Sequence, residues 1–139
     1  MNSFEFQPKP RLVFGTGELS RLGELARVEG FRRTLLVADP GLMATPHVDR
    51  ALGILRASEI QVETFSGFGE NPDSAMIERG RAVAAEIGID SLVGLGGGSS
   101  MDTAKGISFL LTNGGTMADY RGFGKARSPL LPMIGVPTT

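Results

Sequence analysis

Three consecutive glycines followed by two serines are the residues of this sequence best suited to bind a ligand. The segment Leu95–Lys105 runs Leu-Gly-Gly-Gly-Ser-Ser-Met-Asp-Thr-Ala-Lys, so an apolar stretch passes through Gly96–Gly98 into a helix-forming run. Because glycine has no Cβ atom, such a loop lets the main chain approach a ligand closely. The free N–H groups and the dipole at the start of a helix attract anions. The segment therefore predicts a binding site for a phosphate or a pyrophosphate.

The same segment also fits simpler interpretations. The glycines suit a tight turn, and Ser99 followed three residues later by Asp102 suits a capping box. The pattern differs from the usual dinucleotide fingerprint, because Ser99 stands where the third glycine of Gly-x-Gly-x-x-Gly belongs. No Gly-Lys-Ser/Thr follows the glycines, which argues against a P-loop and ATP-driven phosphoryl transfer.

Three further polar residues have local interpretations, and two of them, Asp39 and Lys105, also have a ligand-binding one. Asp39 follows the apolar run 34–38, where an acid can accept hydrogen bonds from an adenosine ribose and repel a 2′-phosphate, although Asp-Pro-Gly is also good turn chemistry. Asn71, before Pro72, suits a helix N-cap. Lys105 stands three residues after Asp102, which favours a surface ion pair or a charge facing a pyrophosphate.

Composition excludes several classes of protein. The 139 residues fit one domain, and no run approaches the ~20 apolar residues of a membrane-spanning helix. A net charge of −1 gives no field for binding nucleic acid. The absence of Cys excludes disulfides and thiolate metal sites and makes a reducing cytoplasm the expected location. With His47 as the single histidine, a transition-metal site within this chain is not expected.

Apolar runs alternate with helical periodicity along the whole chain. The spacing predicts strands at 11–14, 34–38, 60–65, 91–95 and 130–136, the last moved by Pro132 to about Met133. It predicts a helix with Thr16 as its N-cap, further helices across 48–55, from Asn71-Pro72-Asp73 to about 87 and over 101–111, and a helical turn at 117–120. This alternation indicates an α/β fold with a parallel sheet, helices on both faces and all strand-to-helix loops at one edge. Because the sequence stops directly after a predicted strand, we expect a truncated sheet.

Several of these motifs together resemble the iron-containing (group III) alcohol dehydrogenases. They are Gly96–Lys105, Asp39-Pro40, Asn71-Pro72, the terminal Val136–Thr139 and the opening Val13–Gly17, which cover the whole chain in the family's order. The resemblance implies a Rossmann-like NAD-binding domain over residues 1–139, the N-terminal half of a two-domain fold shared with dehydroquinate synthase. It places a divalent metal, Fe²⁺ or Zn²⁺, in a C-terminal helical domain absent from this chain.

Site residues follow from the resemblance alone. It implies that Gly97, Gly98 and Ser99 line the pyrophosphate, with Ser100 and Asp102 behind them. Asp39 would bind the adenosine ribose, as in NAD-using members, and Asn71 would lie near the diphosphate and ribose. Thr138 and Thr139 would belong to a loop that contacts the cofactor.

The expected function is therefore the NAD-binding part of an enzyme that transfers hydride between an alcohol or diol and NAD. The chain alone should be inactive, because the metal polarises the alkoxide. Two alternatives remain: a glycerol dehydrogenase-like or other related polyol or phosphate enzyme, and a non-catalytic nucleotide-binding module. The expected partners are a small alcohol or aldehyde and a second copy in a possible homodimer, with no nucleic acid and no membrane.

Overall fold

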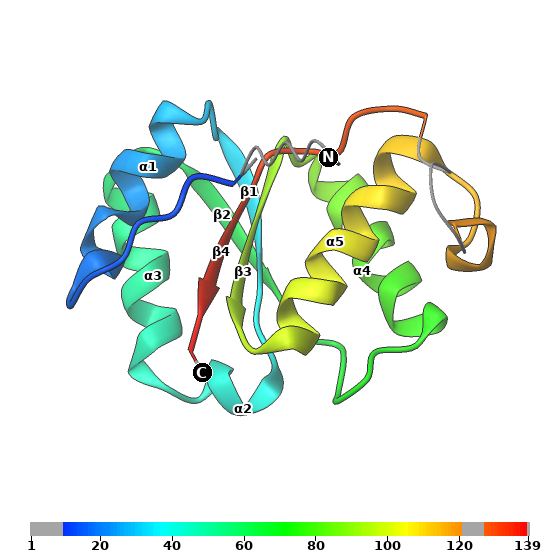
Figure 1. Ribbon diagram of the computed structural model, residues 1–139, viewed down its shortest axis with the longest axis horizontal. Helices are drawn as coiled ribbons and strands as arrows, with labels where there is room; N and C mark the ends of the chain where they lie inside the picture. Colours follow the sequence, from blue (N-terminus) through cyan, green and yellow to red (C-terminus); the bar gives the residue numbers. More distant parts are fainter. Residues whose placement is uncertain (1–9, 121–126, 139) are drawn as a thin grey trace, which may run out of the picture.

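A four-stranded parallel sheet forms the centre of the molecule (Figure 1). The computed structural model describes residues 10–120 and 127–138. The strands are β1 (Arg33–Val37), β2 (Gln61–Phe65), β3 (Ser91–Gly96) and β4 (Met133–Pro137), and they lie in the order β2-β1-β3-β4. Every neighbouring pair is parallel, which confirms the α/β fold and these four predicted strands.

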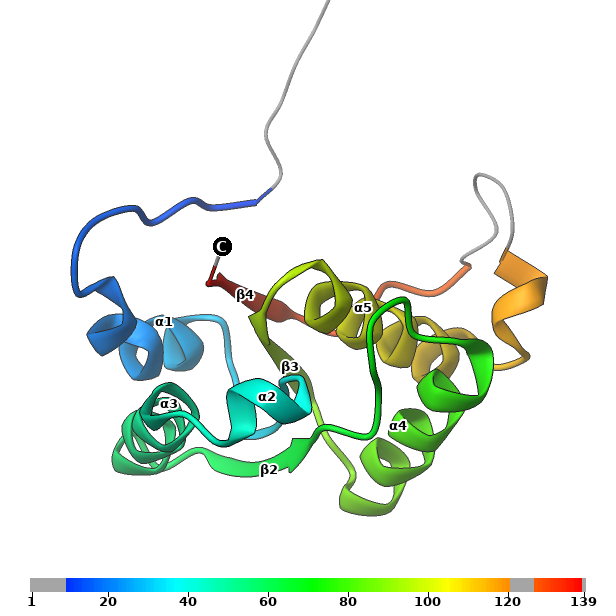
Figure 2. The ribbon, with the colours of Figure 1, turned by 90° about the horizontal axis from the view of Figure 1, so that it is seen from below.

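Helices cover both faces of this sheet, with α1 and α3 on one face and α4 and α5 on the other (Figure 2). The helical elements are η1 (Glu18–Arg21), α1 (Leu22–Val28), α2 (Pro40–Met43), α3 (Pro46–Ala57), α4 (Ser74–Ile87), α5 (Gly98–Asn113) and η2 (Met117–Tyr120). The predicted helices at 48–55, 71–87 and 101–111 and the turn at 117–120 are thus confirmed, with shifted ends.

The core consists of two apolar clusters, one on each face of the sheet. Leu36, Val93 and their neighbours pack against α1 and α3, whereas Leu35 and Leu92 pack against α4 and α5. Alternate residues of one strand therefore point to opposite faces, as the pleat requires. All residues of β3 are buried, which is typical of a central strand in a doubly covered parallel sheet.

Helices α4 and α5 approach each other closely through two glycines. A Cβ atom on Gly106 of α5 would lie 2.9 Å from Ile77 Cδ1, and one on Gly80 of α4 would overlap the Ile107 side chain. Each glycine thus accommodates an isoleucine of the opposite helix. This reciprocal packing holds α5, whose N-terminus follows β3, firmly against its neighbour.

Two local predictions near the N-terminus are wrong. Residues 11–14 are not a strand; they are irregular, and the side chains of Leu12 and Phe14 are 86% and 94% exposed. An apolar run becomes a strand only when a neighbouring strand pairs with it, and the sheet order does not include this one. Thr16 does not cap a helix, because η1 begins at Glu18 with Gly17 as its N-cap.

Asn71 is also not a helix N-cap. The N-cap of α4 is Asp73, whose Oδ1 accepts the Met76 N–H at 2.8 Å. Pro72 consequently precedes the helix instead of occupying its first turn. Asn71 has a φ of 50°, a left-handed conformation that asparagine tolerates better than most residues.

Across the described residues, no helix is long and apolar enough to cross a membrane.

Candidate functional site

The carboxyl ends of all four strands lie at one edge of the sheet, the lower edge in Figure 1. The short helix α2, the start of α5 and the loop 66–73 after β2 are found at this edge. Thr138 joins them, because its N–H donates a hydrogen bond of 3.0 Å to the Gly96 carbonyl. Ligands of open parallel sheets bind at this kind of edge.

Helix α5 begins there without a side-chain cap. Gly97 is the N-cap in extended conformation, and the Met101 N–H closes the first turn on the Gly97 carbonyl at 3.3 Å. The first N–H groups of a helix have no partner within it, so those of Gly98 and Ser99 are without an intrahelical acceptor at the positive end of the helix dipole. Ser99 is the second residue of the helix, so the alternative interpretation, a capping box with Asp102, is not realised.

The three glycines before α5 differ in what surrounds them. Gly96 has a φ of +134°, and a Cβ atom there would lie 2.7 Å from Ser100 Oγ and 3.4 Å from Asp39 Oδ2. Gly97 and Gly98 have no such constraint, since a Cβ atom on either would meet nothing within 4 Å. A tight turn accounts for Gly96 alone. At Gly97 and Gly98 no neighbouring side chain occupies the space beside the backbone at the start of α5.

Asp39 lies beside this glycine segment, as predicted from its place after β1. Its Oδ1 accepts the Leu42 N–H at 2.9 Å and so caps α2, while its Oδ2 is the oxygen near Gly96. The local and the ligand-binding interpretations of Asp39 are therefore compatible, because each involves a different carboxylate oxygen. The helix α2 itself was not predicted, although Asp39 followed by Pro40 is a regular start signal.

Ser100 is buried, and its Oγ has no hydrogen-bond partner in the described part of the chain. Such a group is costly to leave unsatisfied, and a bound ligand or water commonly satisfies it.

Asp102 and Lys105 are exposed, and no ion pair joins them in the described ranges. Asn71 is exposed in the loop after β2, at the same edge. Thr139 lies outside the described residues.

Residues 8–139 match the model of the family described as iron-containing alcohol dehydrogenase. The chain belongs to this family. It is 38% identical over 127 residues to alcohol dehydrogenase 4 of Schizosaccharomyces pombe, covering 91% of this chain and 30% of that protein. It is 37% identical over 128 residues to 1,3-propanediol dehydrogenase of Klebsiella pneumoniae, covering 91% of this chain and 33% of the relative.

Solved structures of the iron-containing alcohol dehydrogenase family have the same fold. The sulfoacetaldehyde reductase of Bifidobacterium kashiwanohense, crystallised in complex with NAD⁺, superposes with a TM-score of 0.86 at 26% identity, over 100% of this chain and 37% of that one. The chain thus spans about a third of the length of these relatives. The Rossmann-like fold class and the family predicted from the motifs are both confirmed.

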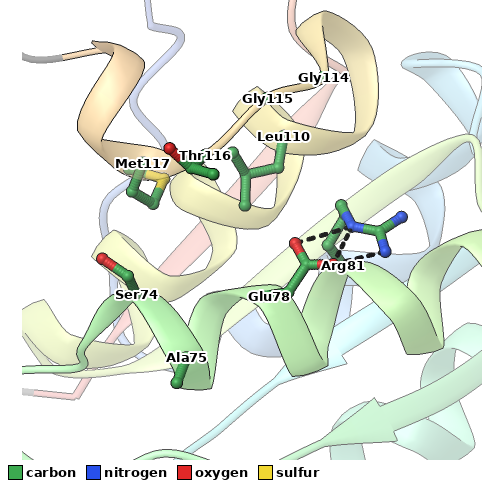
Figure 3. Close-up of a pocket in the computed structure, with 9 residues that line it drawn as sticks. All are labelled: Ser74, Ala75, Glu78, Arg81, Leu110, Gly114, Gly115, Thr116 and Met117. Carbon is green, nitrogen blue, oxygen red and sulfur yellow. Dashed lines mark hydrogen bonds and ion pairs between the residues drawn. The ribbon is translucent and has the colours of Figure 1, made fainter.

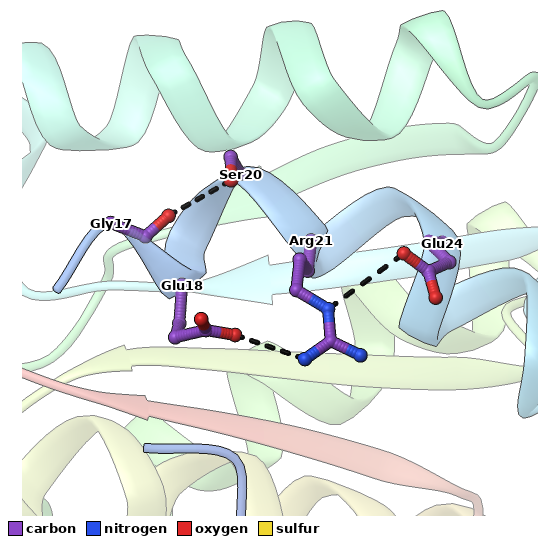
Figure 4. Close-up of polar contacts among 5 residues, drawn as sticks. All are labelled: Gly17, Glu18, Ser20, Arg21 and Glu24. Carbon is purple, nitrogen blue, oxygen red and sulfur yellow. Dashed lines mark hydrogen bonds and ion pairs between the residues drawn. The ribbon is translucent and has the colours of Figure 1, made fainter. Parts of the chain in front are cut away.

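Away from this edge, several charged side chains form ion pairs with each other. Arg21 lies between Glu18 and Glu24, at 3.1 and 3.8 Å, on η1 and α1 (Figure 4). Among the described residues, no group of three or more His, Asp or Glu is arranged to hold a metal ion.

A cavity of about 590 Å³ lies between α4 and the segment that follows α5, with Ser74, Leu110 and Met117 among its lining residues (Figure 3). Its two charged residues, Glu78 and Arg81, form a bidentate pair with distances of 2.6 to 2.9 Å. The hydrogen bonds from Arg81 lower the pKa of the Glu78 carboxyl. The two charged residues of this cavity therefore compensate each other.

Proposed function

We propose that this chain is the NAD-binding domain of a metal-dependent alcohol dehydrogenase that transfers hydride between an alcohol or diol and NAD. One observation supports this function above all: α5 begins without a side-chain cap at Gly97 and Gly98, where an added Cβ atom would meet nothing within 4 Å, and Asp39 lies beside this segment. Unsatisfied N–H donors, a helix dipole and room for close approach together suit a diphosphate. The relative crystallised with NAD⁺ shares this fold.

The residues of the glycine segment would bind the diphosphate and orient the cofactor. The main-chain N–H groups of Gly98 and Ser99 would donate hydrogen bonds to its oxygens, helped by roughly half a unit of positive charge at the helix start. The buried hydroxyl of Ser100, without a partner in the described structure, would gain one from the bound ligand or its water. NAD would supply the hydride chemistry, and this domain would supply position and complementary charge.

Asp39 would select the cofactor. With Oδ1 engaged by Leu42, Oδ2 would accept a hydrogen bond from an adenosine ribose hydroxyl and would repel a 2′-phosphate. Asn71, Asp102, Thr138 and Thr139 would border the same cofactor, as the family resemblance implies. Of these, Thr138 is bonded to the glycine segment itself, through the Gly96 carbonyl.

The divalent metal, Fe²⁺ or Zn²⁺, would be bound by residues outside these 139. The single histidine, His47, is exposed on α3, on the face of the sheet opposite α5. Such a metal would supply the Lewis-acid chemistry that alcohol oxidation needs, so the chain alone would bind the cofactor without oxidising alcohol.

Titration of the chain with NADH tests this function. We expect saturable binding, followed by fluorescence, and no turnover of alcohol. Ser99→Asp should weaken NADH binding by about tenfold or more, because the new carboxylate would repel the negatively charged diphosphate. Ser74→Asp makes the same change in the first turn of α4 and should leave the affinity unchanged. Absence of binding at millimolar NADH would refute the proposal and favour a non-catalytic module.

A further inference from the structure

Two glycines inside neighbouring strands lie side by side beneath the first turn of α5. Gly94 of β3 and Gly135 of β4 are register partners. A glycine in a strand interior weakens the strand and packs no side chain, so it often marks a close approach by another group. Here the approaching group comes from the helix.

The side chain of Met101 lies against both glycines, of which Gly94 is buried and Gly135 is exposed. A Cβ atom on Gly94 would lie 3.1 Å from Met101 Sδ, and a Cβ atom on Gly135 would lie at the same distance. Ordinary contacts of this kind are 3.4 to 4 Å long. The sulfur therefore lies so close to both strands that added methyl groups would have to displace it.

Met101 belongs to the first turn of α5, where the cofactor would bind. Its N–H makes the hydrogen bond to Gly97 that closes this turn, and its side chain is partly buried. The preceding residue, Ser100, contacts Gly96 in the same way. The first turn of α5 thus lies directly on the sheet at Gly94, Gly96 and Gly135.

We propose that Met101 is a positioning residue for cofactor binding. Its sulfur, seated over Gly94 and Gly135, sets the height of the first turn of α5 above the sheet and so the place of the Gly98 and Ser99 N–H groups. Because a helical turn is stiff, a displacement at residue 101 moves these N–H groups with it. The inference rests on the proposed function, in which they bind a diphosphate.

Closing the gap from both sides tests this role. In Gly94→Ala or Gly135→Ala alone, the sulfur can shift toward the remaining glycine, so we expect the Kd for ADP to rise by less than about threefold. In the double variant the added methyl groups displace the sulfur from both glycines at once, and the Kd should rise by about tenfold. ADP is the probe because it carries the diphosphate.

A size exchange supplies the decisive comparison. Met101→Ala alone leaves a void above the glycines and should also raise the Kd for ADP by about tenfold. Combined with Gly94→Ala and Gly135→Ala, the same substitution should return the Kd to within about threefold of that of the unmodified chain, because the two methyl groups refill the void. Failure of the triple variant to recover affinity relative to Met101→Ala would overturn the proposal.

Adenosine binding separates positioning from general loosening. Adenosine lacks the diphosphate, so its affinity should stay constant in every folded variant, as checked by calorimetry together with Tm. Equal losses for adenosine and ADP would overturn the proposal. If the Gly94→Ala/Gly135→Ala chain does not fold, Met101→Ala and the triple variant decide by the same criterion. Absence of ADP binding by the unmodified chain would instead overturn the proposed function and this role with it.

Discussion

Helix α5 contributes glycines to two regions with opposite properties. At its start, Gly97 and Gly98 face open space, whereas in its middle Gly106 is filled by Ile77 of α4. Gly80 of α4 receives Ile107 in return. The same residue type therefore makes room for a ligand in one region and for a neighbouring helix in the other. The number of glycines does not distinguish the two roles. The atoms that surround the position of a Cβ atom at each glycine do distinguish them.

The two regions also differ in the state of their polar groups. The cavity beside α4 has a volume of about 590 Å³, but its Glu78 and Arg81 satisfy each other. The start of α5 has donors without a side-chain cap and the buried Ser100 hydroxyl, which has no partner in the described structure. For an anionic ligand, unsatisfied donors matter more than pocket volume, because a free donor can bind the ligand without first losing a hydrogen bond within the protein.

Gly80→Leu should have the largest effect, because it would disrupt the filled region. A side chain at this position collides with Ile107, and its Cβ atom would lie 2.9 Å from Phe65 Cε1. Overpacking of this kind costs about 3 kcal/mol of unfolding free energy or prevents folding. Urea denaturation followed by circular dichroism measures the loss.

Gly53→Leu is the matched control for this prediction. Gly53 lies in the interior of α3, where an added Cβ atom would meet nothing within 4 Å. The substitution should therefore be neutral or stabilise the chain by up to about 1 kcal/mol through helix propensity. If both variants had the same stability, the contrast between filled and open glycines would be lost.

Asp39→Asn should have an intermediate effect, confined to the open region. The asparagine oxygen can still cap α2 through Leu42, but the negative charge near a 2′-phosphate disappears. The affinity for NADPH relative to NADH should rise by about fivefold, the equivalent of about 1 kcal/mol of removed repulsion. Fluorescence titration with both cofactors measures this ratio.

Asp73→Asn provides the control for Asp39, because Asp73 caps α4 with the same type of hydrogen bond, to Met76. The cofactor ratio should not change in this variant. An unchanged ratio in Asp39→Asn as well would remove Asp39 from the ribose site and leave it with its structural role in α2.

Most of the fold could be predicted from local sequence patterns. The continuous apolar runs of β1 and β3 indicate strands buried on both faces, and Pro132 correctly limits β4 to a start at Met133. Residues 11–14 show the limit of this approach, because pairing with a second strand, not apolar composition, makes a strand. Helix starts failed where two cap residues competed: Asp73 caps α4 in place of Asn71.

The candidate site could be predicted only as far as its loops. Asp39 and the glycine segment meet because parallel strands place their carboxyl ends together, which periodicity alone indicates. Met101 could not be found in this way. Its importance depends on the pairing of Gly94 with Gly135, two positions far apart in sequence whose register only the folded sheet defines.

Glu78→Gln should have the smallest effect and tests whether the cavity belongs to the site. NADH affinity should stay constant, and stability near neutral pH should change little, because the Glu78 and Arg81 side chains are 50% and 32% exposed. Arg81 lowers the pKa of Glu78, so the stabilisation by this pair exists above the pKa of the unfolded chain and disappears as the pH falls through the lowered value. Any difference in Tm between the unmodified chain and the Glu78→Gln variant should therefore shrink from neutral pH to about pH 3. A loss of NADH affinity in Glu78→Gln would instead place the cavity within the cofactor site, and paired charges would no longer distinguish the two regions.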